Sequence, residues 1–510
     1  MAPAVSRAPI SDATRALSRR VTAPVALGVL VAVVAGLNVW WRTIETRPPH
    51  WDMGHHLANS LIYLHGFSLS NLPQFFDSYL FYPPLVYWVA DIFYAVLGNE
   101  SMWVAILSNI VWLAILIGAT YALGRRLWTP RVGWLSVVFV LAAPMIVSTS
   151  KEFMLDLPLT AMSALGLYVL IRSEGFSNRR YSLLFGACCG AALLVKWTFP
   201  LVIALPAIHA AVTALSQIRL RRVFAPVLNL LLAGAVTLAI CGTWYAHNWR
   251  DVGGSSLYYS NNAVGQAQPH VASATSLFYY LWNLLDVQLY LVPLLLVGAG
   301  AVFTFRKREL ARRNVYPLLM VVGTYVLFTM LKHKDPRYTL PMLPALAIVA
   351  TSWLEYVGTR ARAWIEGGFV AYSAIAFLAI SFGTPLLPTS VAFDVPAGAV
   401  GLTRATLFAQ SGYIIGPPTH ENWHQLEPFR IMSRVPVAER SFGYRGPDTI
   451  WFNEHGLNYY SLLYGVRWAR TGPAHFVLIR GRRGPTPHGL TPVARWPLPD
   501  GGTLTLFRRV

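Results

Sequence analysis

The sequence predicts an all-α membrane domain that crosses the bilayer many times, followed by a small α/β domain. Of the 510 residues, 55% are hydrophobic and only 12% are charged, with a mean hydropathy of +0.46. This composition is too apolar for an ordinary soluble protein. Runs that approach the roughly 20 apolar residues of a transmembrane helix recur from Val21 to about Pro385 and then stop.

The first apolar run, residues 21–41, is predicted to be a retained transmembrane helix. It is longer than the core of a signal peptide and lacks a small-residue cleavage site before Trp40 and Trp41. By the positive-inside rule, the arginines before it place the N-terminus in the cytoplasm. These arginines are Arg7, Arg15, Arg19 and Arg20.

Further spans bring the expected number to about eleven, an odd number that places the C-terminal region outside. They are residues 102–123, 132–147, 157–171, 181–195, 199–215, 224–246, 277–303, 315–331, 338–357 and 368–385. Residues 55–98 are aromatic and interrupted by Pro73, Pro83 and Pro84. We expect helices that lie at the outer interface there.

The basic residues argue for a membrane rather than a nucleic acid, although the net charge is +19. They lie mainly in short links between apolar runs and in the C-terminal region, as membrane topology and anionic lipid headgroups require. Membrane lipids are therefore expected partners, and nucleic acid is not. Cys188, Cys189 and Cys241 all lie inside apolar runs, so no disulfide framework is expected.

The expected domains are a cytoplasmic tail (1–20), a transmembrane catalytic domain (21–386) and an outer C-terminal domain (387–510). The last contains turn-rich segments and three strand-like runs, at residues 448–452, 475–479 and 503–507. We therefore expect a small α/β domain after the last span.

Asp52 is the leading candidate for chemistry, because it lies in a polar stretch just beyond the first span, on the predicted outer side. A carboxylate near the membrane is costly unless it faces water or a partner, so a functional site and a solvated loop acid are the two interpretations. His55 and His56 are candidate substrate contacts. Neighbouring residues of a helix point in different directions, so at least one of these histidines is expected to pack at an interface.

A second outer link contains Lys151, Glu152 and Asp156, shortly before Pro158. Capping of a helix N-terminus would by itself explain Asp156. It does not explain why the same outer link also carries Lys151 and Glu152.

The placement of lysines points to an anionic ligand. Only five of the 41 basic residues are lysines, and four of these fall in predicted outer links, where positive charge is disfavoured: Lys151, Lys196, Lys332 and Lys334. Chance is one explanation for so few residues. The functional interpretation is that ammonium groups and Arg337 converge on a phosphate.

Residues 332–344 lead from this charged link into a proline-interrupted helix. Such prolines are tolerated within a span where the freed backbone groups line a cavity. A charged loop before an irregular helix is the simpler interpretation, and a cleft at the outer helix ends is the functional one.

Taken in this order and on one predicted face, these features resemble the GT-C glycosyltransferases that use polyprenyl-phosphate sugars, in the branch of bacterial aminoarabinose transferase and the protein O-mannosyltransferases. The matching features are Asp52, Tyr82-Pro83-Pro84-Leu85 with Trp88, Asp156 before Pro158, residues 190–197 with Lys196, and residues 334–344. The resemblance covers roughly the first 390 residues. It departs at Met53, where many relatives carry a second acid, which argues against roles that need two adjacent carboxylates.

The resemblance implies transfer of a sugar from a polyprenyl-phosphate donor to a lipid, glycan or protein acceptor, with inversion, at the outer face of the bacterial inner membrane. It implies Asp52 as the general base, and Asp156 as a residue that orients the acceptor or binds a metal. Lys196, Lys332, Lys334 and Arg337 are implied as contacts of the donor phosphate. The expected substrate contacts are His55, His56, Tyr82, Trp88, Lys151, Glu152 and Tyr338.

Two other classes of function stay open at this point. A transporter or flippase of a lipid-linked saccharide is one, although the charges cluster at one face and no inverted repeat is visible. A non-catalytic assembly protein that works through its C-terminal region is the other. No cofactor is certain, and a divalent metal remains one alternative. Residues 419–424 could hold such a metal, but histidines in a loop are more often not metal ligands.

Overall fold

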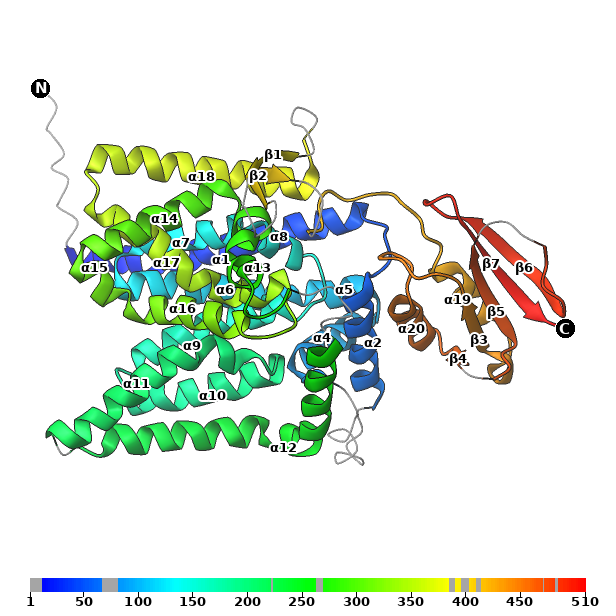
Figure 1. Ribbon diagram of the computed structural model, residues 1–510, viewed down its shortest axis with the longest axis horizontal. Helices are drawn as coiled ribbons and strands as arrows, with labels where there is room; N and C mark the ends of the chain where they lie inside the picture. The colour runs from blue at the N-terminus through cyan, green and yellow to red at the C-terminus, as the bar shows by residue number, and fades with distance from the viewer. Residues whose placement is uncertain are drawn as a thin grey trace, which may run out of the picture.

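The computed structural model describes residues 12–66, 81–221, 223–262, 269–384, 390–395, 403–409, 414–470, 472–481 and 485–510. The sequence landmarks Arg7, Pro73 and Arg222, and the expected domain boundary at 386/387, lie outside them. Figure 1 shows a helical bundle whose members run mostly along the long axis, with a β-sheet projecting beyond one end. The predicted fold class, a helical membrane domain with a small C-terminal α/β domain, is confirmed.

The first half of the bundle is built from successive helices. They are α1 (Asp12–Ile44), α2 (Trp51–Gly66), α4 (Leu85–Leu97), α5 (Met102–Leu107), α6 (Asn109–Leu127), α7 (Pro130–Ala142), α8 (Pro144–Thr149), α9 (Asp156–Arg172), α10 (Arg179–Val195), α11 (Phe199–Arg221) and α12 (Ala225–Asn262). Most follow the predicted spans, but the span predicted over residues 132–147 is divided into two helices, α7 and α8. Helix α12 continues past the predicted end at residue 246, because a helix does not need to stop where its apolar run stops. Helix α1 begins inside the predicted tail 1–20.

The second half contains broken helices. It consists of α13 (Ala274–Asn283), the π-helical turn η3 (Leu284–Gln288), α14 (Leu291–Arg306), α15 (Arg308–Arg313), α16 (Val315–Thr329), η4 (Pro336–Met342), α17 (Leu343–Ser352), η5 (Trp353–Tyr356) and α18 (Thr359–Phe382). The prediction of one continuous span over residues 277–303 is wrong. Tyr290 adopts a positive φ of 63° at the break, and Gln288 turns aside to donate hydrogen bonds to the Pro336 carbonyl and to Thr339 Oγ1 (2.9 Å).

Five of the described helices are long and apolar enough to cross a membrane: residues 23–44, 102–127, 199–218, 225–254 and 359–382. Four shorter ones, α4, α7, α14 and α16, are also apolar. The protein is therefore a multi-pass membrane protein, and the number of about eleven spans stays a prediction. Small residues bring α10 and α12 together, since a Cβ on Gly190 would lie 2.7 Å from the Ile240 Cβ.

The C-terminal part contains an antiparallel hairpin, β1 (Ser390–Val395) with β2 (Thr403–Ala409), and a five-stranded mixed sheet. The sheet has the order β4-β3-β5-β7-β6, where β3 is parallel to β4 and β5, and β7 is antiparallel to β5 and β6. The strands of this sheet are β3 (Ser441–Arg445), β4 (Arg467–Trp468), β5 (Phe476–Gly481), β6 (Leu490–Pro497) and β7 (Thr503–Arg509). The same part of the chain contains the helices α19 (Leu426–Met432) and α20 (Glu454–Leu463).

The strands predicted over 475–479 and 503–507 are confirmed as β5 and β7. The strand predicted over 448–452 is wrong. That segment is an irregular turn in which the Phe452 backbone N–H donates to Thr449 Oγ1 (3.1 Å), and Asn453 then caps α20 by accepting from the Gly456 N–H (2.8 Å). Side-chain hydrogen bonds of this kind compete with strand pairing.

Candidate functional site

A cleft of about 780 Å³ lies between the helical bundle and the C-terminal part of the chain. One wall comes from the α1–α2 link, α8 and η4, and the other comes from residues 414–419, Ile450 and Trp451. The ionisable side chains that line it are Arg47, His50, Asp52, Glu152 and Arg337. Sequence-distant segments therefore bring three of the predicted site residues to one cavity.

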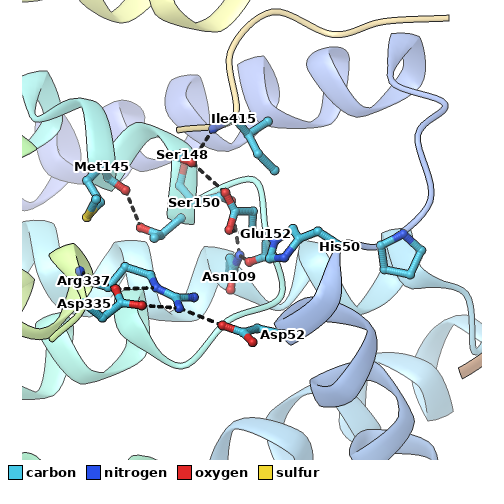
Figure 2. Close-up of polar contacts among 12 residues, drawn as sticks. His50, Asp52, Asn109, Met145, Ser148, Ser150, Glu152, Asp335, Arg337 and Ile415 are labelled. Carbon is cyan, nitrogen blue, oxygen red and sulfur yellow. Dashed lines mark hydrogen bonds and ion pairs between the residues drawn. The ribbon is translucent and has the colours of Figure 1, made fainter. Parts of the chain in front are cut away.

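Asp52 and Arg337 form the central ion pair of this cleft (Figure 2). The Arg337 Nη2 donates to Asp52 Oδ2 at 2.7 Å and to Asp335 Oδ2 at 2.7 Å. The Arg337 Nε donates to Asp335 Oδ1 at 3.0 Å, so Asp335 holds the guanidinium in two places. Asp335 also caps η4 by accepting from the Arg337 backbone N–H (2.8 Å). Arg337 is thus fixed on its own turn and aimed at Asp52, which lies in the first turn of α2.

The charges in this group stabilise one another. Burial would raise the pKa of Asp52, but the charge and hydrogen bond of Arg337 outweigh burial and hold that pKa well below its usual range. Burial opposes the charge of Arg337, yet the Asp335 carboxylate keeps the pKa of Arg337 above its ordinary value. The Asp52 side chain is 50% exposed toward the cleft, so it is ionised and accessible.

Asp156 and Lys196 form a second, buried ion pair. Asp156 lies in the first turn of α9, Lys196 directly follows α10, and the Lys196 Nζ donates to Asp156 Oδ1 at 2.9 Å. The Lys196 Nζ also lies 5.7 Å from the centre of the Tyr338 ring. Neither charge lines the cleft, but the charge of Asp156 acts on Arg337. The pair therefore lies within electrostatic range of the cleft.

Glu152 lines the cleft and is held by three elements (Figure 2). Its Oε1 accepts from Ser148 Oγ at 2.6 Å and its Oε2 bonds to His50 Nε2 at 3.2 Å, while its backbone carbonyl accepts from Asn109 Nδ2 at 2.7 Å. The Ile415 backbone N–H donates to Ser148 Oγ at 2.8 Å. His50 is not predicted from the sequence, because it lies before α2 and follows two prolines that favour a plain linker.

Lys151 does not join Asp52. Its Nζ is buried on the other side of the link, where it donates to Ser381 Oγ at 2.9 Å and lies 5.2 Å from the centre of the Trp41 ring. Burial lowers the pKa of Lys151 to about 7, although the nearby Glu152 acts against this. Through these contacts Lys151 links α18 to α1.

The two neighbouring histidines of α2 point in different directions, as expected. His56 is buried and its Nδ1 bonds to the Tyr87 hydroxyl at 2.9 Å. The His55 ring lies 6.0 Å from Tyr82 and 5.3 Å from His455 of the C-terminal domain. Burial and the neighbouring His455 lower the pKa of His55 to about 4, so this side chain is neutral at pH 7.

Trp88 packs edge-on to Tyr63 at 6.4 Å and borders an apolar cluster of α10 and α12 around Trp244. It is not among the side chains that line the cleft. Trp88, which the sequence suggested as a sugar contact, therefore packs between helices and not at the cleft.

Of the predicted residues in the segment 332–338, only Arg337, which lies in η4, lines the cleft. The Lys334 Nζ donates to the carbonyls of Thr329 and Leu331, each at 2.8 Å, at the C-terminus of α16. A cation in this position is favoured by the carbonyl ends of a helix. Lys332 is exposed, and the Tyr338 ring packs 5.5 Å from Phe328.

The C-terminal domain packs directly against the helix that carries Asp52. A Cβ on Gly54 would lie 2.7 Å from the Gly456 nitrogen and 2.8 Å from the His455 carbonyl carbon, so α2 and α20 touch at their glycines. His455 lies 5.4 Å from the Trp51 ring. Only glycine allows this approach, and no sequence pattern in either helix indicates its partner.

We therefore expect Gly54→Ala to destabilise the docked C-terminal domain by about 1–3 kcal/mol, the usual cost of overpacking. Gly66→Ala at the end of the same helix is the control, because a Cβ there would meet nothing within 4 Å. The midpoint of thermal unfolding and the rate of proteolysis between the domains would be measured in detergent. Equal values for the two variants would contradict the close contact.

The described residues contain no group of three or more His, Cys, Asp and Glu side chains that could hold a metal ion. The oxygens of Asp52, Glu152 and Asp156 are turned to Arg337, His50 and Lys196 instead. In residues 419–424, His424 pairs with Glu427 at 3.1 Å. We therefore assign no chemical step to a metal.

Comparisons with known proteins point to membrane glycosyltransferases. The sequence profile of a family described as dolichyl-phosphate-mannose-protein mannosyltransferase matches residues 82–247. A curated relative, the undecaprenyl phosphate-alpha-4-amino-4-deoxy-L-arabinose arabinosyl transferase of Erwinia tasmaniensis, is 27% identical over 323 residues, or 61% of this chain and 56% of that protein. The match thus spans little more than half the length of that relative.

Two solved structures extend the likeness beyond the matched range. ArnT from Cupriavidus metallidurans, bound to undecaprenyl phosphate, superposes with a TM-score of 0.58 at 16% identity and covers 94% of this chain and 97% of that chain. The oligosaccharyltransferase of Archaeoglobus fulgidus, tethered with an acceptor peptide, gives a TM-score of 0.51 at 13% identity and covers 87% and 63%. At such identities the likeness concerns the fold.

Proposed function

The chain has the GT-C fold of membrane glycosyltransferases, and from this premise we propose that it transfers a sugar from a polyprenyl-phosphate-linked donor to an acceptor at the outer face of a bacterial inner membrane. The observation that carries the proposal is the Asp52–Arg337 pair in a cleft at the end of an apolar bundle. A carboxylate and a guanidinium on one cavity suit an acceptor hydroxyl and a donor phosphate. The curated and structural relatives, whose names include undecaprenyl phosphate, support the class of donor.

In the proposed reaction, Asp52 removes the proton from the acceptor nucleophile as that atom attacks the anomeric carbon of the donor sugar. The bond between the anomeric carbon and the donor phosphate breaks in the same step, so the configuration inverts. The polyprenyl phosphate leaves with the bonding electrons and needs charge stabilisation more than a proton. The Asp52 side chain is 50% exposed and lines the cleft, which leaves room for the acceptor.

Arg337 supplies that stabilisation in the proposal, because it is the predicted phosphate contact that lines the cleft. Its present bond to Asp52 makes the carboxylate a weak base, since the pKa is depressed. When a donor phosphate shares the guanidinium, this depression is relieved and Asp52 becomes a stronger base. Binding of the donor would thus prepare the base for the acceptor.

In the proposal, the buried pair of Asp156 and Lys196 acts on the cleft through its electrostatic field, because neither residue lines the cleft. The charge of Asp156 acts on Arg337, and the Lys196 Nζ lies 5.7 Å from the centre of the Tyr338 ring. Lys196 is the candidate to approach a phosphate that enters deeply, and Asp156 orients Lys196. Lys332 and Lys334 stay weaker candidates, because the first is exposed and the second caps α16.

The direct test is release of polyprenyl phosphate. Purified protein in detergent, given a radiolabelled polyprenyl-phosphate sugar and envelope extract as acceptor, is expected to release free polyprenyl phosphate in step with labelled product. A transporter would move the intact donor across a vesicle and cleave nothing. Uncleaved donor with active transport would therefore refute the proposed reaction.

The proposed orientation has its own test, because α2, which carries Asp52, and the C-terminal domain lie at the same end of the bundle (Figure 1). An alkaline phosphatase reporter fused after Val510 is expected to be active, as it is only in an oxidising outer compartment. A green fluorescent protein fused at the same residue serves as the opposite reporter. Bright fluorescence with inactive phosphatase would invert the orientation.

A further inference from the structure

A second cavity, of about 440 Å³, lies on the C-terminal domain and shares no lining residue with the cleft of Asp52. It lies along β3, the residues that follow β4 and the start of α20: Arg445 is the last residue of β3, Arg470 lies just beyond β4, and Glu454 is the first residue of α20. Arg509 at the end of β7 completes the rim.

The charge of this cavity is not neutralised by the fold. Among the residues that the structure describes, Arg445, Arg470 and Arg509 form no ion pair, although Glu454 is on the same rim. Other arginines of this domain do have partners. Arg480 pairs with Asp500, Arg508 with Glu439 at 2.6 Å, and Arg440 donates to the Val435 carbonyl at 2.9 Å. Three exposed arginines that form no ion pair among the described residues therefore line one hollow.

The rest of the lining suits a sugar ring. The Arg470 guanidinium lies 5.0 Å from the centre of the Trp468 ring, which packs on Phe442 at 5.3 Å. Gly443 keeps the floor open, because a Cβ there would approach only Ala469 and Ala474, at 3.9 and 4.0 Å. A tryptophan ring beside arginines suits an acidic saccharide, because a guanidinium group binds carboxylate or phosphate through two parallel hydrogen bonds.

We propose that this cavity binds an acidic saccharide, a sugar that carries carboxylate or phosphate groups, and that it anchors a glycan acceptor outside the catalytic cleft. The role as an acceptor anchor rests on the proposed function, whereas the binding itself does not. Adjacent residues of α20 serve both places, since Glu454 lines the cavity and His455 contacts Trp51 beside Asp52. The sheet projects beyond the bundle (Figure 1), and a cavity of about 440 Å³ suits a sugar chain better than the flat surface of a bilayer.

The test uses the full chain in nanodiscs of neutral phosphatidylcholine. Binding of hexagalacturonate is measured by microscale thermophoresis, with maltohexaose as the neutral sugar and inorganic phosphate as the free anion. We expect hexagalacturonate to bind, and the double variant R445Q/R470Q to weaken binding at least tenfold. The control R508Q, which removes an arginine that already has Glu439 as its partner, is expected to stay within twofold.

Several results of this experiment would contradict the proposed saccharide site. No binding of hexagalacturonate, equal weakening by R508Q, or equally tight binding of maltohexaose would each overturn the proposal. Phosphate that binds as tightly as hexagalacturonate would overturn its sugar component. Release of polyprenyl phosphate is measured on the same samples: transfer without hexagalacturonate binding refutes this site alone, whereas binding without transfer supports this site and refutes the proposed function.

Discussion

Replacing Asp52 with Asn is expected to lower the turnover of sugar transfer by about 10²- to 10⁴-fold, the range that general-base catalysis contributes. The amide keeps the size of the side chain but has no basic oxygen for the acceptor proton. It still accepts a hydrogen bond from Arg337, which now reaches Asp52 at 2.7 Å. The rate of release of polyprenyl phosphate in the presence of acceptor is the measurement.

The control for this change is Asp251→Asn in α12, an acid that does not line the cleft. Both variants should elute as the wild type does in size-exclusion chromatography and keep its helical circular dichroism. If Asp52→Asn retains turnover within a few-fold of the wild type, Asp52 is not the base. Loss of turnover in both variants would mean that the assay reports general damage.

Replacing Arg337 with Gln is expected to remove both the phosphate contact and the partner of Asp52. Removing one partner of a buried pair leaves the other charge uncompensated, at a cost of about 3–5 kcal/mol. The buried carboxylate that loses this ion pair is Asp335, whose side chain is only 12% exposed. We expect turnover to fall by about 10²-fold or more, since one preorganised donor to a developing anion contributes that much.

The same variant should change the pH dependence of kcat/KM. In the wild type the charge of Arg337 holds the pKa of Asp52 below its usual range, so Asp52 stays ionised at and above the ordinary pKa of an aspartate and produces no acid limb there. Without Arg337, burial is the largest remaining influence and raises this pKa. The acid limb should therefore appear at higher pH in Arg337→Gln. Stability follows the same sign, because the contribution of the pair is present above the ordinary aspartate pKa and is lost on acidification.

Arg126→Gln is the matched control, since Arg126 pairs with Glu174 at 3.1 Å on an exposed part of the bundle. An exposed pair of this kind contributes about 0–1 kcal/mol, so turnover and pH profile should match the wild type. An Arg337→Gln profile that superposes on the wild-type profile would show that Arg337 does not set the charge state of Asp52.

Many helices of the membrane domain can be predicted from the sequence, because the bilayer imposes a length and an apolar composition on every span. The predicted spans correspond to helices α9, α10 and α16 within a few residues. The break at residues 284–290 is different. An apolar run reads the same whether it is straight or broken, and the hydrogen bonds of Gln288 to η4 that accompany the break come from a segment far along the chain.

The candidate site, too, could be predicted from the sequence only in part. The sequence by itself determined the kinds of residue present, an acid after the first span and a charged link before η4, because unpaired charge beside a membrane is expensive and therefore conspicuous. Only the tertiary structure decided which of them meet: Arg337 turns to Asp52, while Lys151 and Lys334 turn to Ser381 and to the end of α16. A side chain's partner depends on the packing of remote segments, which composition does not encode. The contact of Gly54 with Gly456, which sets α20 and its His455 beside Asp52, is the extreme case, since glycine carries no chemical signal until two backbones touch.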